Sequence, residues 1–130
     1  MKIAIGTDDK KTIRKGYFCE SRYFLVTEIL NAQIVGKELR DNSNFGAGKE
    51  NQNQAERVTN LLNDCGIFMA ASMEEKSLVE IGSRNVDCII TNIEGVDAAI
   101  SSYIDGRLEE FKYYDANAND LIPCPLRKYV

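Results

Sequence analysis

The spacing of the hydrophobic residues divides the chain near residue 53. Before that point, apolar residues gather in short runs over residues 2–6, 23–29 and 34–40, and each run predicts a strand. A polar stretch at residues 31–33 predicts the hairpin between the second strand and the third. The third run is the most polar and is expected near an edge. Together the three strands predict an antiparallel meander.

Beyond residue 53 the apolar spacing becomes helical. Helices are predicted over residues 53–65, over residues 73–84, where Ser72 and Glu75 match a capping box, and over residues 96–104. Continuous apolar runs at residues 67–71 and 86–90 predict strands buried on both faces. Because crossovers through a helix are right-handed, these strands should run parallel to the first. The expected fold class is α/β and ribonuclease H-like, with a five-stranded mixed sheet of order 3-2-1-4-5 and three helices.

The length of 130 residues fits one domain, which we expect to span residues 1–108. Residues 109–130 form a C-terminal tail, and packing of this tail on the same domain is one option. Within it, Phe111, Tyr113 and Tyr114 suit either an added strand or packing on a helix.

The composition narrows the class of function. The net charge is -4, from 16 Lys and Arg against 20 Asp and Glu, whereas a nucleic-acid-binding protein needs a basic surface. No apolar run approaches the ~18 residues of a membrane span, and the first residues lack the apolar segment of a signal peptide, so the cytoplasm is the expected compartment. The absence of histidine excludes Ser-His and Cys-His nucleophilic catalysis. The four cysteines lie too far apart for a zinc ribbon.

The predicted topology gathers several loops at the carboxyl ends of the parallel strands, where open α/β sheets bind ligands. These loops are residues 7–22, 41–52, 71–74 and 91–95, and all three helices are expected to begin at this edge. Helix N-termini favour anions. The first loop also has five basic residues: Lys10, Lys11, Arg14, Lys15 and Arg22. Either these residues attract an anion to a pocket, or they merely solvate a long loop.

Cys19 is the cysteine that this arrangement singles out. It follows Tyr17 and Phe18 in the first loop, where basic surroundings would favour its thiolate form. Cys65 falls on the apolar face of a predicted helix and Cys88 in the middle of a predicted strand, so both are expected in the core.

Several short motifs, at residues 1–9, 17–19, 22–26, 61–66, 71–73 and 98–108, form a pattern that covers residues 1–108. In these motifs the chain resembles the dinitrogenase iron-molybdenum cofactor biosynthesis family, the small carriers that hold the nitrogenase cofactor or its precursors. The resemblance implies a ribonuclease H-like fold and the binding of metal–sulfur clusters without catalysis.

The sequence departs from the family pattern at three places. Tyr17-Phe18-Cys19 stands where members typically show His-Phe-Gly, and Ala-Ser-Met-Glu at residues 71–74 stands where many show Gly-Gly-Met-Gly. The histidine that is often found before the first helix is absent from residues 41–52. Given the resemblance, Cys19 is the candidate metal ligand, as a soft thiolate for an iron–sulfur type cluster.

The first hypothesis is therefore a non-catalytic carrier of an anionic metal–sulfur cluster, of the iron–molybdenum cofactor or precursor type, bound transiently. A cofactor-receiving metalloenzyme or another carrier would be its further partner. The candidate cofactor-binding residues are Thr7, Asp8, Tyr17, Phe18, Cys19, Arg22, Ser72 and Met73.

Two other hypotheses belong to different classes. A sensing or partner-binding module for a phosphate-bearing metabolite would use the same edge without needing Cys19. A metal-dependent nuclease is disfavoured, because residues 3–5 and 71–72 supply no carboxylate, and Asp8 and Asp9 alone cannot hold two metal ions.

Overall fold

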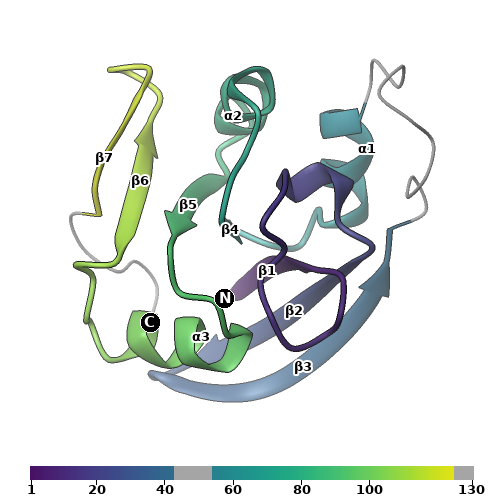
Figure 1. Cartoon of the computed structure of the whole chain (residues 1–130), viewed down its shortest axis with the longest axis vertical. Helices are drawn as coiled ribbons and strands as arrows, with labels where there is room; N and C mark the ends of the chain where they lie inside the picture. Colours follow the sequence, from purple (N-terminus) through teal and green to yellow (C-terminus); the bar gives the residue numbers. More distant parts are fainter. Residues whose placement is uncertain (43–53, 125–130) are drawn as a thin grey trace.

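The computed structural model describes residues 1–42 and 54–124, which form a seven-stranded mixed sheet with three α-helices (Figure 1). The strand order is β3-β2-β1-β4-β5-β6-β7. In chain order the elements are β1 (Lys2–Thr7), the 3-10 turn η1 (Phe18–Glu20), β2 (Tyr23–Leu30), β3 (Gln33–Asp41), α1 (Gln54–Leu61), β4 (Ile67–Ala70), α2 (Glu75–Gly82), β5 (Asp87–Thr91), α3 (Val96–Ile104), β6 (Phe111–Asp115) and β7 (Asp120–Pro123).

The order predicted for the first five strands, 3-2-1-4-5, is confirmed. β1 pairs antiparallel with β2 and parallel with β4, and β4 runs parallel to β5. The prediction of a five-stranded sheet is wrong, because the C-terminal segment adds β6 antiparallel to β5, and β7 antiparallel to β6. In β6, Phe111 and Tyr114 are buried whereas Lys112 is exposed, so this short strand covers an edge that β5 would otherwise leave open.

Three predicted helix boundaries differ from the structure, and one of them is the end of α2, which lies at Gly82 rather than at residue 84. The capping box of Ser72 and Glu75 is not formed: the N-cap of α2 is Glu74, without a side-chain hydrogen bond, and the helix begins at Glu75. The first helix ends at Leu61 rather than at residue 65. Of the predicted loop over residues 41–52, Asp41 belongs to β3, whereas residues 43–52 lie outside the described residues.

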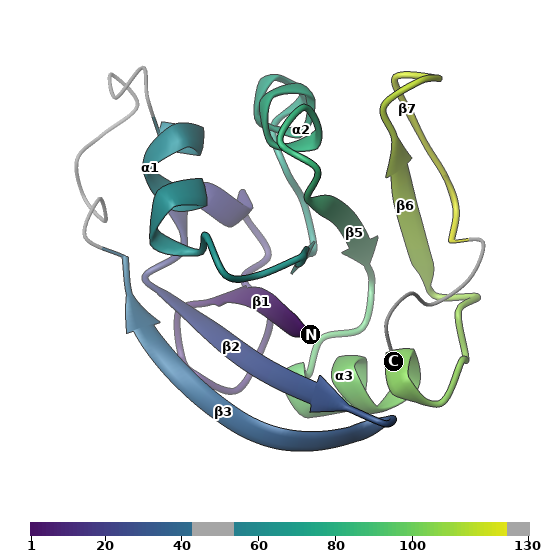
Figure 2. The same ribbon diagram turned by 180° about the vertical axis from the view of Figure 1, so that it is seen from behind.

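The sheet separates two hydrophobic cores. Along β1, Ala4 faces the core that α1 and α2 cover, whereas Ile3 and Ile5 face the core that α3 covers. Figures 1 and 2 accordingly show α1 and α2 on one side of the sheet and α3 on the other. Cys65 and Cys88 are buried in the core beneath α1 and α2, which confirms that prediction. No helix within residues 1–42 and 54–124 is long and apolar enough to cross a membrane.

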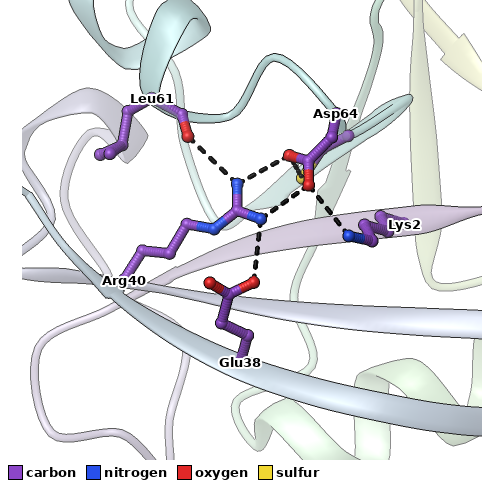
Figure 3. A network of polar contacts seen from close by, with 6 residues as sticks. Lys2, Glu38, Arg40, Leu61 and Asp64 are labelled. Carbon is purple, nitrogen blue, oxygen red and sulfur yellow. Dashed lines mark hydrogen bonds and ion pairs between the residues drawn. The ribbon is translucent and has the colours of Figure 1, made fainter.

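An ion network joins the sheet to the end of α1 (Figure 3). Arg40 on β3 donates through both Nη atoms to the Asp64 carboxylate, at 2.7 Å each. Its Nη1 also donates to the Leu61 carbonyl at the C-terminal end of α1, at 3.1 Å, and its Nη2 donates to Glu38 at 2.9 Å. Lys2 Nζ reaches Asp64 at 3.0 Å. Hydrogen bonding from Arg40 is the largest cause that holds the pKa of Asp64 well below its usual range.

Replacing Arg40 with Leu should lower the free energy of unfolding by about 1–2 kcal/mol at pH 7, because charge-assisted hydrogen bonds around a mostly buried guanidinium are lost. The Arg40 side chain is only 15% exposed. Because the pKa of Asp64 is lowered in the folded state, the stability that it contributes is present above the pKa of the unfolded chain and is lost as the pH falls. Urea denaturation should therefore show a smaller difference between wild type and variant at pH 3 than at pH 7.

Arg84→Leu is the matched control for this measurement. It removes the same charge but breaks only a surface pair within α2 and the turn after it, from Arg84 to Glu80 at 3.4 Å. Such pairs contribute at most about 0.5 kcal/mol. An equal decrease in the free energy of unfolding in the two variants would contradict a structural role for the Arg40 network.

Candidate functional site

The first half of the loop after β1 is a compact turn built on Thr7 and Asp9. Thr7 Oγ1 donates to the Thr12 carbonyl at 2.6 Å and accepts the Lys10 N–H at 3.0 Å. Asp9 Oδ1 accepts the N–H groups of Lys11 and Thr12, at 2.9 and 2.7 Å. These backbone hydrogen bonds, with Thr12 first, hold the pKa of Asp9 well below its usual range. Thr7, a predicted binding residue, is fully buried and shapes the loop.

Asp8 closes the loop by joining its two ends. Its Oδ1 accepts the Arg22 N–H at 2.9 Å, and its Oδ2 pairs with the Arg14 guanidinium. Two predicted binding residues, Asp8 and Arg22, are therefore brought together by the structure, and one of the five basic side chains of the loop is paired within the loop itself.

The loop lies across the ends of the neighbouring parallel strands. The Ile13 N–H donates to the Glu94 carbonyl, after β5, at 2.8 Å. The Phe18 N–H donates to the Ser72 carbonyl, after β4, at 3.0 Å. The structure thus places the segments after β1, β4 and β5 at one edge of the sheet, as the topology predicted.

Phe18 fixes the second half of the loop. Its ring lies 5.0 Å from that of Phe24 on β2 and is stacked at 5.1 Å on that of Phe68 on β4. The loop approaches β1 so closely that a Cβ on Gly6 would lie 2.2 Å from Ser21 Oγ. Only glycine allows this contact, and it seats Phe18 in the core.

Cys19 follows Phe18 into the same core and is 4% exposed. Burial, the largest cause, raises the pKa of its thiol to about 12, and the nearby carboxylates of Glu74, Glu20 and Glu80 raise it further. The expectation of basic surroundings that favour a thiolate is therefore wrong. A hydrogen bond with Ser77 lowers this pKa, but burial outweighs it, and no cation of the loop is among the main causes.

A shallow depression of about 780 Å³ lies beside Tyr17, at the start of α2. Tyr17 is 42% exposed, whereas Met73 is buried in the core and Ser72 is half-buried. Three carboxylates and one ammonium surround the depression, which makes it electronegative rather than suited to an anion. Its lining residues are Tyr17, Glu74, Glu75, Lys76, Val79 and Glu80.

Positive charge converges instead on Tyr23, the first residue of β2. Lys10 Nζ lies 5.0 Å from the centroid of its ring, and Arg22 Cζ lies 5.7 Å from the same centroid. Tyr23 pairs with Thr7 at the end of β1, so this group, which we call the Tyr23 site, stands at the expected edge. Sequence reasoning missed the role of Tyr23. The positive φ of Lys10, 70°, which bends the loop there, has no clear signature in the sequence.

The described residues offer no ready-made metal site. Among residues 1–42 and 54–124, no group of three or more His, Cys, Asp or Glu side chains could hold a metal ion. All four cysteines are free and buried. The predicted binding residues thus divide into two groups: Thr7, Asp8 and Arg22 lie around the Tyr23 site, whereas Tyr17, Phe18, Cys19, Ser72 and Met73 lie towards α2.

Comparison with known proteins gives a family and a fold. The model of the dinitrogenase iron-molybdenum cofactor family matches residues 1–106. The crystal structure of PH0822 matches with a TM-score of 0.65 and 20% identity over 81% of this chain and 91% of that chain. A "putative dinitrogenase" from Methanocaldococcus jannaschii matches with a TM-score of 0.62 and 18% identity, over 87% and 93% of the two chains. A "putative NifB protein" from Thermotoga matches with a TM-score of 0.61 and 18% identity, over 84% and 91%. At these identities the structures show a shared fold alone, and no curated protein matches the chain.

The native protein should resist thiol labelling. With a pKa of about 12 for Cys19, only about one thiol in 10⁴ is ionised at pH 8, and burial also excludes the reagent. Treatment with iodoacetamide at pH 8, followed by peptide mapping, should label Cys19 at least ~100-fold more slowly in the native protein than in urea. Labelling of Cys19 at a similar rate in both conditions would contradict its burial.

Proposed function

The chain belongs to the dinitrogenase iron-molybdenum cofactor family, and we propose that it is a non-catalytic carrier for a metal–sulfur cluster of the iron–molybdenum cofactor or precursor type. The cluster is cargo, bound transiently at the carboxyl end of the parallel strands. A cofactor-receiving metalloenzyme or another carrier then takes it over. Beyond the mixed α/β sheet, we assign the fold as ribonuclease H-like, because β1 to β5 have the order and directions of that topology.

The Tyr23 site is the observation that supports this location best. Two cations, Lys10 and Arg22, stand over one aromatic ring at the strand-end edge, on a protein whose net charge is -4. An anionic cluster would be attracted by these charges and repelled by the carboxylates around Tyr17. The flat ring of Tyr23 adds a surface against which a compact cluster can pack.

The mode of binding that fits the described residues is outer contact rather than ligation by cysteine. Cys19 is buried in the core beneath α1 and α2, so it does not present its sulfur to a cluster at this edge. A cluster that keeps its own ligands needs only charge and hydrogen bonds from the protein, and Lys10 and Arg22 supply both. The four free cysteines suit a reducing compartment such as the cytoplasm.

Anaerobic reconstitution tests the proposal. The wild type is incubated with iron–molybdenum–sulfur clusters, passed through a gel-filtration column, and analysed for metal content and visible absorbance. Lys10→Glu combined with Arg22→Glu should reduce the retained metal at least ~10-fold, because two attractive charges become repulsive. Cys19→Ser should retain as much cluster as the wild type.

Lys112→Glu combined with Arg107→Glu is the matched control, because it changes the net charge equally at exposed positions on and before β6. Retention should be unchanged in this control. Loss of cluster in folded Cys19→Ser, with retention in the Tyr23-site variant, would contradict outer binding and make Cys19 the ligand. A wild type that retains no cluster but is stabilised by a nucleotide would favour the phosphate-bearing metabolite instead.

A further inference from the structure

A second hollow of about 630 Å³ lies on the opposite edge of the sheet from the Tyr23 site, at the amino ends of β4 and β5. Its origin is the way in which β5 and β6 separate. Their pairing runs from Thr91 with Phe111 to Ile89 with Tyr113 and stops there, although β5 begins two residues earlier and β6 continues to Asp115. We call this hollow the β5–β6 cleft.

The described part of the lining of the β5–β6 cleft has a negative charge. Asp87, the first residue of β5, is the only charged side chain among the described residues that line it. Tyr113 Oη donates to Asp87 Oδ1 at 3.3 Å, which places the carboxylate beside an aromatic ring. Gly82, the last residue of α2, also lines the cleft, so the negative end of that helix dipole lies there. Carboxylate, helix end and tyrosine hydroxyl together favour a positively charged group.

The walls favour a ligand with an apolar body as well. The rings of Tyr113 and Tyr114 and the side chain of Val86 line the cleft, and a cation over a tyrosine face is attracted by the ring. The volume lies within the range of about 300–1,000 Å³ that is usual for small-molecule sites. Tyr114 is held in place by its hydrogen bond to Asn119, at 2.6 Å, so this wall is formed without a ligand.

We propose that the β5–β6 cleft binds a small organic cation, an ammonium group carried on a flat apolar body. The ammonium group lies against Asp87, and the apolar body lies between the tyrosine rings and Val86. This site is independent of the Tyr23 site, and it stands whether or not the chain carries a cluster.

Gly66 provides a way to close the cleft without strain. It lines the cleft, a Cβ built on it meets no atom within 4 Å, and its φ is not positive. A leucine at this position would therefore extend into open space and occupy the volume that the ligand needs. Asp87→Asn, in contrast, keeps the shape of the cleft and removes its charge.

The test is a titration with phenethylammonium at pH 7, followed by the amide NMR signals of the full chain. The signals of Asp87, Tyr113 and Val86 should shift and saturate. The neutral isostere 2-phenylethanol should bind at least about tenfold more weakly, because it lacks the charge. Asp87→Asn should weaken binding of the cation at least about tenfold, and Gly66→Leu should abolish the shifts.

Glu109→Gln is the matched control, since it removes an exposed carboxylate outside the cleft, and its affinity should equal that of the wild type. The dispersed amide spectra of the variants report their folding, and Gly66→Leu still tests the site if Asp87→Asn fails to fold. Three results would each overturn the proposal: the absence of saturable shifts in the wild type, equal binding of the neutral alcohol, or unchanged binding in folded Gly66→Leu.

Discussion

The seating of Phe18 against Phe24 and Phe68 is the constraint on which the candidate site depends. Burying this ring removes a large apolar surface from water and turns the long loop after β1 back onto the sheet. Gly6 makes the approach sterically feasible. Once Phe18 is inside, Cys19 must follow it, and the same packing that orders the loop converts its cysteine from a reactive candidate into a core residue. Exposed side chains at this edge therefore include those of the ordered polar half of the loop, such as Lys10 and Lys11.

The hydrophobic pattern was sufficient to predict the first five strands, because a strand that is buried on one or both faces needs apolar residues at a regular spacing. Their order then followed from the hairpins and helix crossovers between them. It was insufficient for β6 and β7. In β6, Lys112 and Asp115 interrupt a run that becomes a strand only because β5 offers an open edge. The predicted start of α2 was wrong for a related reason. The Ser72 carbonyl accepts a hydrogen bond from the Phe18 N–H, more than fifty residues away in the chain, so a local capping rule did not apply.

In the candidate site, local sequence was likewise insufficient to predict how the charged side chains are arranged. The sequence correctly located five basic residues in the loop, but their positions relative to Cys19 depend on folding. Asp8 pairs with Arg14, Lys10 and Arg22 lie over the ring of Tyr23, and the cysteine is buried in the core, where the carboxylates of η1 and α2 raise its pKa rather than lower it. Counting charges along a loop gives their number, whereas their arrangement depends on partners that other elements supply. The order of residues 17–19 alone could not reveal that Cys19 is buried in the core.

The strand-end edge is consequently divided into a positive half and a negative half. The positive half is the pair of Lys10 and Arg22 over Tyr23, beside which the Asp8 carboxylate also lies, and the negative half is the depression at α2. An anionic cargo at Tyr23 would leave the acidic depression free beside it. A partner that approaches this edge would meet both halves, and basic side chains on that partner would be attracted to the depression while they compete for the cargo. For the carrier proposed above, this division of charge would be a physical means to release an anion in the presence of its acceptor, without any change in the fold.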